Sequence, residues 1–354
     1  MCHYFSVNNF EEVYPQLACR EPEEWSLSWL KHRLDYYKRL EKEHVRKFEA
    51  RGEEPPPSAP RNDEEEDFSK YTPGFFSQVM TLLGRRFSIF FRDRGQLLLQ
   101  IAMIIIFPIM VACFTSKGGY ELTNLNDFSS TNVTEVARAM KTQAEENALI
   151  GSAISGIIMF QVILLGLMGS NNSSREIAGE RLIMEKEKFA GVSAWAYVSS
   201  KVLFLSLLVL VQSLWMFLFV HFCWDVEMDI VNHLVFLLLA NAAMTSVCLG
   251  ISANARTADQ ASLLSIYLVG FQLPLSGAVL ALNKVLAVIT QPFISAYWAW
   301  SGSISGVEKE YADVVDSIVQ TDFASRNMSF IVLGIHIVVG IVLTYVGVRR
   351  TRWE

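Results

Sequence analysis

The stretch YVSSKVLFLSLLVLVQSLWMFLFVHF, residues 197–222, decides the fold class of this 354-residue chain. Apart from Lys201 it holds only uncharged side chains and His221, and most of them are large and apolar. A helix needs about 20 consecutive apolar residues to cross the hydrocarbon core of a bilayer. The stretch therefore predicts a helix that spans a membrane.

Five further stretches share this length and composition. In chain order the six candidate spans are residues 97–114, 150–169, 197–222, 231–252, 261–282 and 330–348. Six such stretches exclude the alternative of buried helices in a soluble protein, because long apolar runs report membrane spans well. We expect an all-α membrane protein with six transmembrane helices.

The basic residues orient these spans. No secretory leader is visible at the start, so the N-terminus is expected in the cytosol. Most basic residues then fall on the inner side, which is the bias that cytosolic loops carry. We expect an integral, multi-pass protein of the plasma or inner membrane with both termini in the cytosol. The outer segments 115–147 and 283–327 are long, and the second has aromatic residues typical of an interfacial or re-entrant piece: Phe293, Tyr297, Trp298 and Trp300.

The residues before the first span divide into three parts. Residues 1–50 predict a cytosolic helical segment, whose apolar stripe packs either on its own domain or on another subunit. Residues 51–70 form an acidic, proline-rich linker that cannot bury enough apolar area to order itself. Residues 71–96 mix aromatic side chains with Arg85, Arg86, Arg92 and Arg94, which predicts an amphipathic connecting helix along the membrane surface. Residues 97–348 form the six-helix domain, and 349–354 a cytosolic tail.

The chain lacks the motifs of a catalytic site. It has no P-loop, HExxH or GxSxG sequence, and its five cysteines show no metal or redox spacing. We therefore expect no enzymatic activity of its own and no bound metal, and nothing predicts nucleic-acid binding. A lone histidine in the last span, His336, is expected to be packed and hydrogen-bonded rather than a proton relay.

The inner loop SREIAGERLIMEKEKFAGVSAW, residues 174–195, is the most informative polar segment. Glu180-Arg181, Glu187-Lys188 and Gly191 follow one another in an order that resembles the first intracellular loop of the G-type ABC transporters, the white and pleiotropic-drug-resistance group. Helical spacing further predicts an ion pair between Arg181 and Glu185.

Other segments resemble that family in the same order along the chain. LLGRRFSIFFRDRGQLLLQ (82–100) resembles its connecting helix, with Arg86, Arg92 and Asp93 at the characteristic positions. ARTADQASLL (255–264) resembles its short inner turn before the fifth span, and LPLSGAVLAL (273–282) resembles the end of that span. Residues 1–30 further resemble the tail that follows the ATPase domain in bacterial G-type-like fusions. The resemblance to the membrane domain covers about residues 70–354.

The resemblance implies the membrane-spanning permease subunit of an ATP-driven ABC-2 type exporter. Such a subunit binds no cofactor, since a partner ABC ATPase binds ATP and magnesium, and it works in membrane lipid as a homodimer or pseudo-dimer on a lipid-like or hydrophobic substrate. The loop residues Glu180, Arg181, Glu187, Lys188 and Gly191 would carry the coupling, together with Arg85, Arg86, Arg92 and Asp93 of the connecting helix.

The resemblance also suggests where a substrate path would run. Ala278 and Val279 stand where family members often have two leucines that plug the path, and both are smaller. The other candidates are Phe160, Gln161, Asn241, Phe271, Gln272 and Pro274. For each polar residue, a hydrogen bond between helices is the alternative explanation. A secondary transporter driven by an ion gradient and a non-transporting membrane anchor or sensor remain as rival functions, and the substrate itself is left open.

Overall fold

A computed structural model of the chain describes residues 73–115, 122, 133–224, 226–280 and 282–350, together with single positions 24, 27 and 42. The chain divides into two compact units, and residues 73–350 form the one discussed below. The helix expected within residues 1–50, the linker 51–70 and the end of the tail lie outside the described residues.

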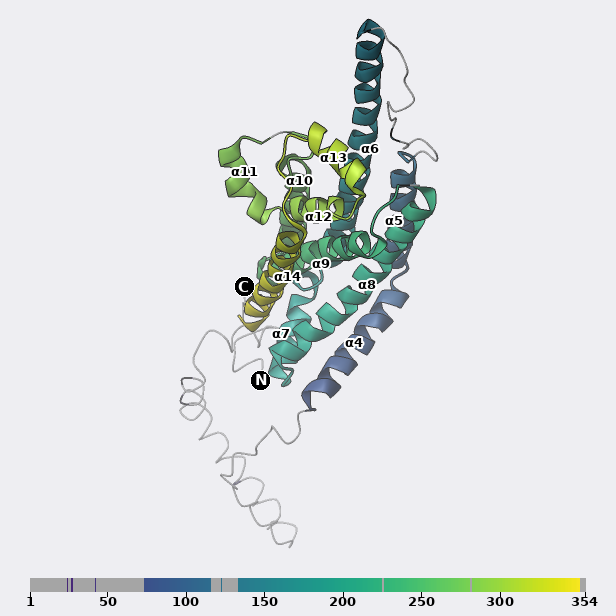
Figure 1. The fold of residues 1–354 in the computed structure, drawn as a ribbon. Coiled ribbons are helices and arrows are strands. Elements are labelled where there is room, and N and C mark those ends of the chain that lie inside the picture. The colour runs from purple at the N-terminus through teal and green to yellow at the C-terminus, as the bar shows by residue number, and fades with distance from the viewer. Residues whose placement is uncertain are drawn as a thin grey trace. The chain divides into compact units, whose positions relative to one another are not determined.

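The connecting helix and the first span are separated by a single residue. Helix α4 (Phe75–Arg92) buries Val79, Leu82 and Phe90 and packs along α8 (Ala194–Cys223), as Figure 1 shows. Helix α5 (Arg94–Ala112) begins after Asp93, whose carboxylate accepts hydrogen bonds from the N–H groups of Gly95 and Gln96 at 3.0 and 3.1 Å. This N-cap fixes the helix boundary three residues before the start that apolarity predicted for the span.

Five of the six expected spans are confirmed by length and composition among the described residues. They are α5, α6 (Val133–Ser173), α8, α9 (Ile230–Asn254) and α14 (Arg326–Arg349). The remaining stretch, the fifth in chain order, forms α10 (Ala258–Leu275), which is 18 residues long and does not meet the same measure.

The expected end of the fifth span, residue 282, is wrong by seven residues. Helix α10 stops at Leu275, directly after Pro274, and Gly277 then adopts a positive φ of 83°. A glycine takes this left-handed conformation without the steric cost of a Cβ atom, so the chain turns there. The apolar residues beyond it looked continuous with the span because composition does not show a turn.

The outer loop expected at residues 115–147 is also partly wrong, because residues 133–147 are helical. They continue into the second span as one 41-residue helix, α6, whose N-terminal end stands clear of the other labelled helices in Figure 1. At 1.5 Å per residue this helix is about 60 Å long, twice the hydrocarbon thickness of a bilayer. Its first turns are polar, so composition indicated a loop.

Helix α9 lies at the centre of the unit, where it contacts α6, α8, α10, α12 and α14. Its most extensive contact is with α14. A Cβ atom at Gly340 would lie 2.4 Å from the backbone of Ser246, and one at Gly347 would lie 2.7 Å from the carbonyl oxygen of Ala253. These glycines let the two backbones approach closely, as small residues do between membrane helices.

The long segment between α10 and α14 folds into short helices. They are α11 (Lys284–Thr290), a 3-10 turn (Gln291–Phe293), α12 (Ser295–Ile304) and α13 (Lys309–Ile318). Every residue of α12 is buried, and the helix packs on α9, α14 and α6. The half-buried His336 of α14 donates a hydrogen bond from Nε2 to the carbonyl oxygen of Pro292 at 2.9 Å, so it is hydrogen-bonded as expected.

Candidate functional site

The segment between α6 and α8 forms a turn and a short helix. A 3-10 turn (Ala178–Glu180) leads into α7 (Arg181–Phe189), with Glu180 just before its first residue. The helix ends at Phe189 with Ala190 as its C-cap, and Gly191 then adopts a φ of 94°, the left-handed conformation in which glycine commonly ends a helix. The polar order noticed in the sequence therefore maps onto one helix and its two ends.

The connecting helix α4 lies against this segment. Arg85 of α4 forms an ion pair with Glu187 of α7. The side chain of Gln78 accepts a hydrogen bond from the N–H group of Ser193 at 3.0 Å and donates one to the carbonyl oxygen of Gly191 at 3.4 Å. The predicted loop and connecting-helix residues are thus brought together, and Gln78 is a contact that the sequence did not reveal.

A cluster of four charges lies beside these contacts, and we name Arg86, Glu176, Lys201 and Glu180 the charge quartet. Arg86 Nη2 lies 2.6 Å from Glu176 Oε2, Lys201 Nζ lies 2.8 Å from Glu176 Oε1, and Lys201 Nζ lies 2.6 Å from Glu180 Oε2. All but Glu180 are buried. The quartet joins α4, the segment that follows α6, and the N-terminal part of α8.

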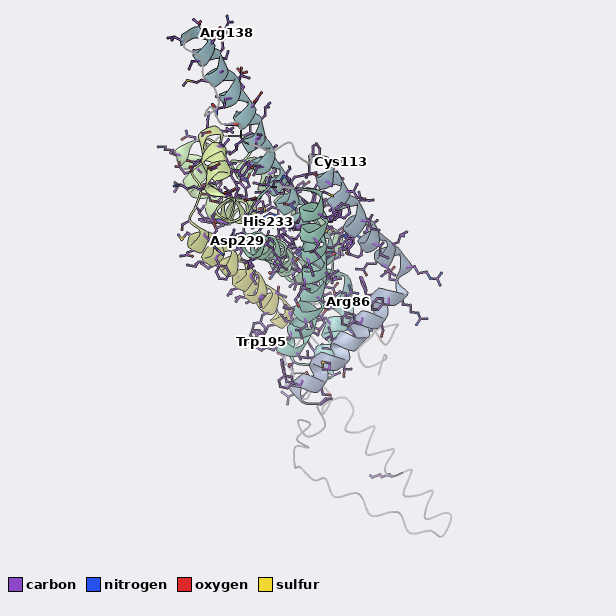
Figure 2. All side chains as sticks on the ribbon, turned by 45° about the vertical axis from the view of Figure 1, so that its right-hand side comes forward. Arg86, Cys113, Arg138, Trp195, Asp229 and His233 are labelled. Atoms are coloured by element: carbon purple, nitrogen blue, oxygen red, sulfur yellow. The ribbon has the colours of Figure 1, made fainter. Side chains whose placement is uncertain are left out.

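The quartet pairs two acidic with two basic groups. Such pairing, with hydrogen-bonded geometry, is what makes buried charges tolerable, because an uncompensated charge in an apolar interior is costly. The guanidinium of Arg86 also lies 4.8 Å from the ring centre of Phe204, in cation–π geometry. The charge quartet is therefore electrically balanced, and we call the contact that it forms between these helices the joint. It lies at one end of the helices, near Arg86 and Trp195 in Figure 2.

Two basic residues of α7 cap the ends of other helices. Arg181 Nη2 donates hydrogen bonds to the carbonyl oxygens of Ala253 and Ala255, at 2.9 and 2.8 Å, where α9 ends. Lys188 Nζ donates to the carbonyl oxygen of Val348 at 2.8 Å, where α14 ends. The last carbonyls of a helix have no partner within the helix, and a cation there also meets the negative end of the helix dipole.

These caps overturn the expected Arg181–Glu185 pair. Glu185, which is 1% exposed, instead lies 3.2 Å from Lys188 Nζ, while Arg181 reaches the end of α9. Spacing along one helix suggested the pair, but the unsatisfied carbonyls of a neighbouring helix bind the guanidinium. Sequence spacing does not show such a neighbour.

Two functional candidates of the connecting helix lie outside the joint. Asp93 caps α5, as described above, and Arg92 is exposed in the last turn of α4. Two quartet members were missed by sequence reasoning, Glu176 and Lys201. Lys201 carried a usable signal, since an ionisable residue in a predicted span marks a functional site by default.

The polar candidates for a substrate path join helices to one another. Gln161 of α6 lies 3.1 Å from Nε2 of His233 in α9, and Asn241 of α9 donates to Ser213 of α8 at 3.2 Å. Gln272 of α10 accepts a hydrogen bond from the N–H group of Ala296 at 2.9 Å and so holds the start of α12. The alternative explanation, hydrogen bonds between helices, accounts for all three.

Three other candidates meet at a wide cavity of about 880 Å³. Phe160, Ala278 and Val279 line it, whereas Phe271 and Pro274 are exposed elsewhere on α10. The remaining lining residues come from the end of α5, from α6, from the end of α10 and from the segment after α13: Phe114, Ser152, Ala153, Ser155, Gly156, Ile157, Met159, Ile163, Leu273, Gly277, Ile318, Val319 and Gln320.

No charged side chain lines this wide cavity within the described ranges. Phe114 and Phe160 meet edge to face across its wall, with ring centres 5.7 Å apart. Thr321 donates a hydrogen bond to the carbonyl oxygen of Gly277 at 2.7 Å, which ties the segment after α13 to the turn after α10. The cavity is suited to an uncharged, largely apolar molecule.

Among the described residues of 73–350, no three His, Cys, Asp or Glu side chains are grouped so that they could hold a metal ion. The charged joint and the wide cavity are separate features, because no residue of the quartet lines the cavity. One provides ion pairs between helix ends, and the other provides apolar space.

Comparison with known proteins assigns the family. No curated protein sequence matches the chain. A family model described as ABC-2 type transporter matches residues 77–299, which is more than half of the chain and includes most of α4, all of α5 to α11 and the joint. The model describes the membrane-spanning permease domain of such transporters, which generally pairs with an ABC ATPase. The chain, an integral membrane protein by its long apolar helices, therefore belongs to the ABC-2 type transporter family.

Proposed function

We propose that the chain is the permease of an ATP-driven exporter that moves a lipid-like or hydrophobic substrate, with both termini in the cytosol of a plasma or inner membrane. Two copies, or one copy and a related chain, enclose the path, because two-fold assemblies are the commonest closed ones. The partner ATPase binds ATP and magnesium. The family match supports the permease role, and the uncharged wall of the wide cavity supports the substrate class.

The observation that carries this proposal is the position of residues 175–193. This segment contacts α4 through Glu187, α9 through Arg181 and α14 through Lys188. It also reaches α10, where the hydroxyl of Ser262 lies 2.6 Å from Arg175 Nε, and α8 through Lys201. This one segment therefore contacts five helices, so a displacement of the segment would act on all five.

The solvent-exposed face of α7 offers a surface on which a partner protein could act. Leu182 is 70% exposed and Ile183 is 51% exposed. Apolar side chains on a polar loop are suited to contact with a partner protein. We infer that the ATPase docks there and that α4 and α7 move together during the transport cycle.

The rival functions have weaker support. A carrier driven by an ion gradient is expected to place ionisable groups near its substrate. The described lining of the wide cavity has none, and the buried charges of the quartet are paired with each other. Nothing in the described residues favours an anchor or sensor over a permease.

A charge swap between α4 and α7 tests the proposal. In reconstituted vesicles with the partner ATPase, Arg85→Glu and Glu187→Arg should each reduce ATP-dependent transport at least about tenfold, because each places like charges together. The double variant restores the pair in reverse and should recover most of the transport. Since the pair is partly exposed, its effect on stability should stay below about 1 kcal/mol.

The chain offers a matched control on α6. Lys141 and Glu145 form an exposed ion pair at 3.7 Å, far from the joint. The corresponding swap, Lys141→Glu with Glu145→Lys, and its single variants should leave transport unchanged. If the Arg85 and Glu187 single variants also transport at the wild-type rate, coupling does not pass through this contact and the proposed mechanism is wrong.

A further inference from the structure

The elbow between α4 and α5 carries two basic side chains and one acidic side chain, and so a net positive charge. Arg92 and Arg94 flank the break at Asp93, and both are exposed. Neither forms an ion pair with any residue that the structure describes. Asp93, the acid between them, is engaged with the N–H groups of Gly95 and Gln96.

Other basic residues at the same end of the domain differ in this respect. Arg85 pairs with Glu187, Arg86 pairs with Glu176, and Arg175 lies 3.4 Å from Asp259. Unlike these three, the elbow arginines have no acidic partner among the described residues, so they are available to a negatively charged partner from outside the chain. Charge complementarity requires that this partner be an anion.

An apolar surface continues from these charges along α5. Arg94, Leu98, Ile101, Ile105 and Ile109 follow at spacings of three and four, which places them on one face of the helix. Leu98 is 70% exposed, and the isoleucines are 44–49% exposed. On the α4 side, Phe91 is 65% exposed beside Arg92.

A phospholipid has a matching order of groups, with a charged headgroup followed by apolar acyl chains. A helix that crosses a bilayer with Arg94 in its first turn holds the guanidinium at headgroup level and Leu98 to Ile109 in the hydrocarbon. We propose that the elbow, defined as Phe91, Arg92, Arg94 and Leu98, binds an anionic phospholipid of the adjacent leaflet. The arginines contact its phosphate, and the exposed face of α5 contacts an acyl chain.

A lipid bound at the elbow would also affect the joint, because both lie on α4. Arg85 and Arg86 lie on α4, two turns or less before Arg92, and pair with Glu187 and Glu176. A lipid held at the elbow fixes the end of α4 against α5. It therefore limits how far α4 can move relative to α7.

Lipid counting tests the binding. The purified full chain is equilibrated in mixed detergent micelles with phosphatidylglycerol and phosphatidylcholine, and native mass spectrometry measures how much of each lipid stays bound. The wild-type chain should prefer phosphatidylglycerol. Because each basic side chain near an anionic surface contributes about fivefold, Arg92→Gln with Arg94→Gln should weaken this preference by roughly 30-fold.

Matched variants separate the elbow from general charge. Arg138→Gln with Lys141→Gln removes the same charge from the exposed end of α6 and should leave the preference intact. Arg92→Lys with Arg94→Lys should retain most of it. If the glutamine double variant does not fold, as judged by its gel-filtration profile, Arg94→Gln alone should still lose about fivefold.

Three outcomes would overturn the proposal. One is a wild-type chain that binds both lipids equally, and another is an elbow variant that keeps the full preference. The third is displacement of phosphatidylglycerol by soluble glycerol phosphate at equal concentration, which would show a simple anion site without a contribution from the acyl chain. The assay does not depend on transport, so its result is independent of the proposed exporter function.

Discussion

At the scale of single residues, Lys201 shows how the joint is built. It lies within a stretch of apolar residues, yet its side chain is buried between the carboxylates of Glu176 and Glu180. The sequence led us to Glu180 and Arg86 through their resemblance to a family pattern. It did not lead to Glu176 and Lys201, because their partners are fixed by helix packing across 21 to 90 residues of chain.

Glu176→Gln is expected to destabilise the protein by about 3 kcal/mol. The substitution leaves the buried guanidinium of Arg86 without a carboxylate. Removal of one partner from a buried ion pair typically costs roughly 3–5 kcal/mol. Thermal unfolding in detergent measures the change. Glu310→Gln, which removes an exposed carboxylate from α13, is the control and should stay within about 0.5 kcal/mol of the wild type. Equal stability of both variants would contradict the burial of an ion pair at Glu176.

The caps on α9 and α14 also change what a mutation in the loop is expected to do. From spacing alone, Arg181 would be an exposed helix residue whose loss is harmless to folding. In the structure it donates to carbonyl oxygens at the end of α9, so its loss leaves partly buried acceptors without a hydrogen-bond donor. Arg85 and Glu187 are therefore the better pair for a test of coupling, because they are partly exposed.

At the scale of helices, the sequence predicted the spans well and their ends less well. Apolarity located α5, α8, α9 and α14 to within a few residues. It missed the polar extension of α6 because a helix outside the bilayer needs no apolar stretch. It overran α10 because the turn at Gly277 depends on backbone conformation rather than on hydropathy. Contacts between these helices could not be predicted, since they depend on which faces meet.

The α9–α14 pair is expected to depend on Gly340. Gly340→Leu should destabilise the protein by about 3 kcal/mol or prevent its folding, because its Cβ atom would meet the backbone of Ser246 and force the helices apart. Gly334→Leu on the same helix has no atom within 4 Å of its added Cβ and should be tolerated. The yield of folded protein and the unfolding temperature distinguish the two. Similar behaviour of both variants would show that the close approach is not essential.

At the scale of the whole molecule, the wide cavity is expected to hold the substrate. Gly156 lies on its wall, and an added Cβ there meets nothing within 4 Å. Gly156→Leu should therefore fold normally, with a gain in stability of up to about 1 kcal/mol from helix propensity, while it fills part of the cavity. ATP-dependent transport should fall at least about tenfold. Gly334→Leu is again the control, and normal transport by Gly156→Leu would place the path elsewhere.

The charged joint and the extended end of α6 lie at opposite ends of the domain, as Arg86 and Arg138 show in Figure 2. The proposed orientation puts the joint in the cytosol, where most basic residues gather. In a chain without its native cysteines, a cysteine at Arg138 or Asp316 should react with a membrane-impermeant reagent added outside sealed, right-side-out vesicles. A cysteine at Lys186 should react only after the vesicles are opened, because α7 would then face inward. Reaction of the Lys186 position in sealed vesicles would place the joint outside, where no ATPase supplied with cytosolic ATP could act on it, and both the orientation and the proposed coupling would fail together.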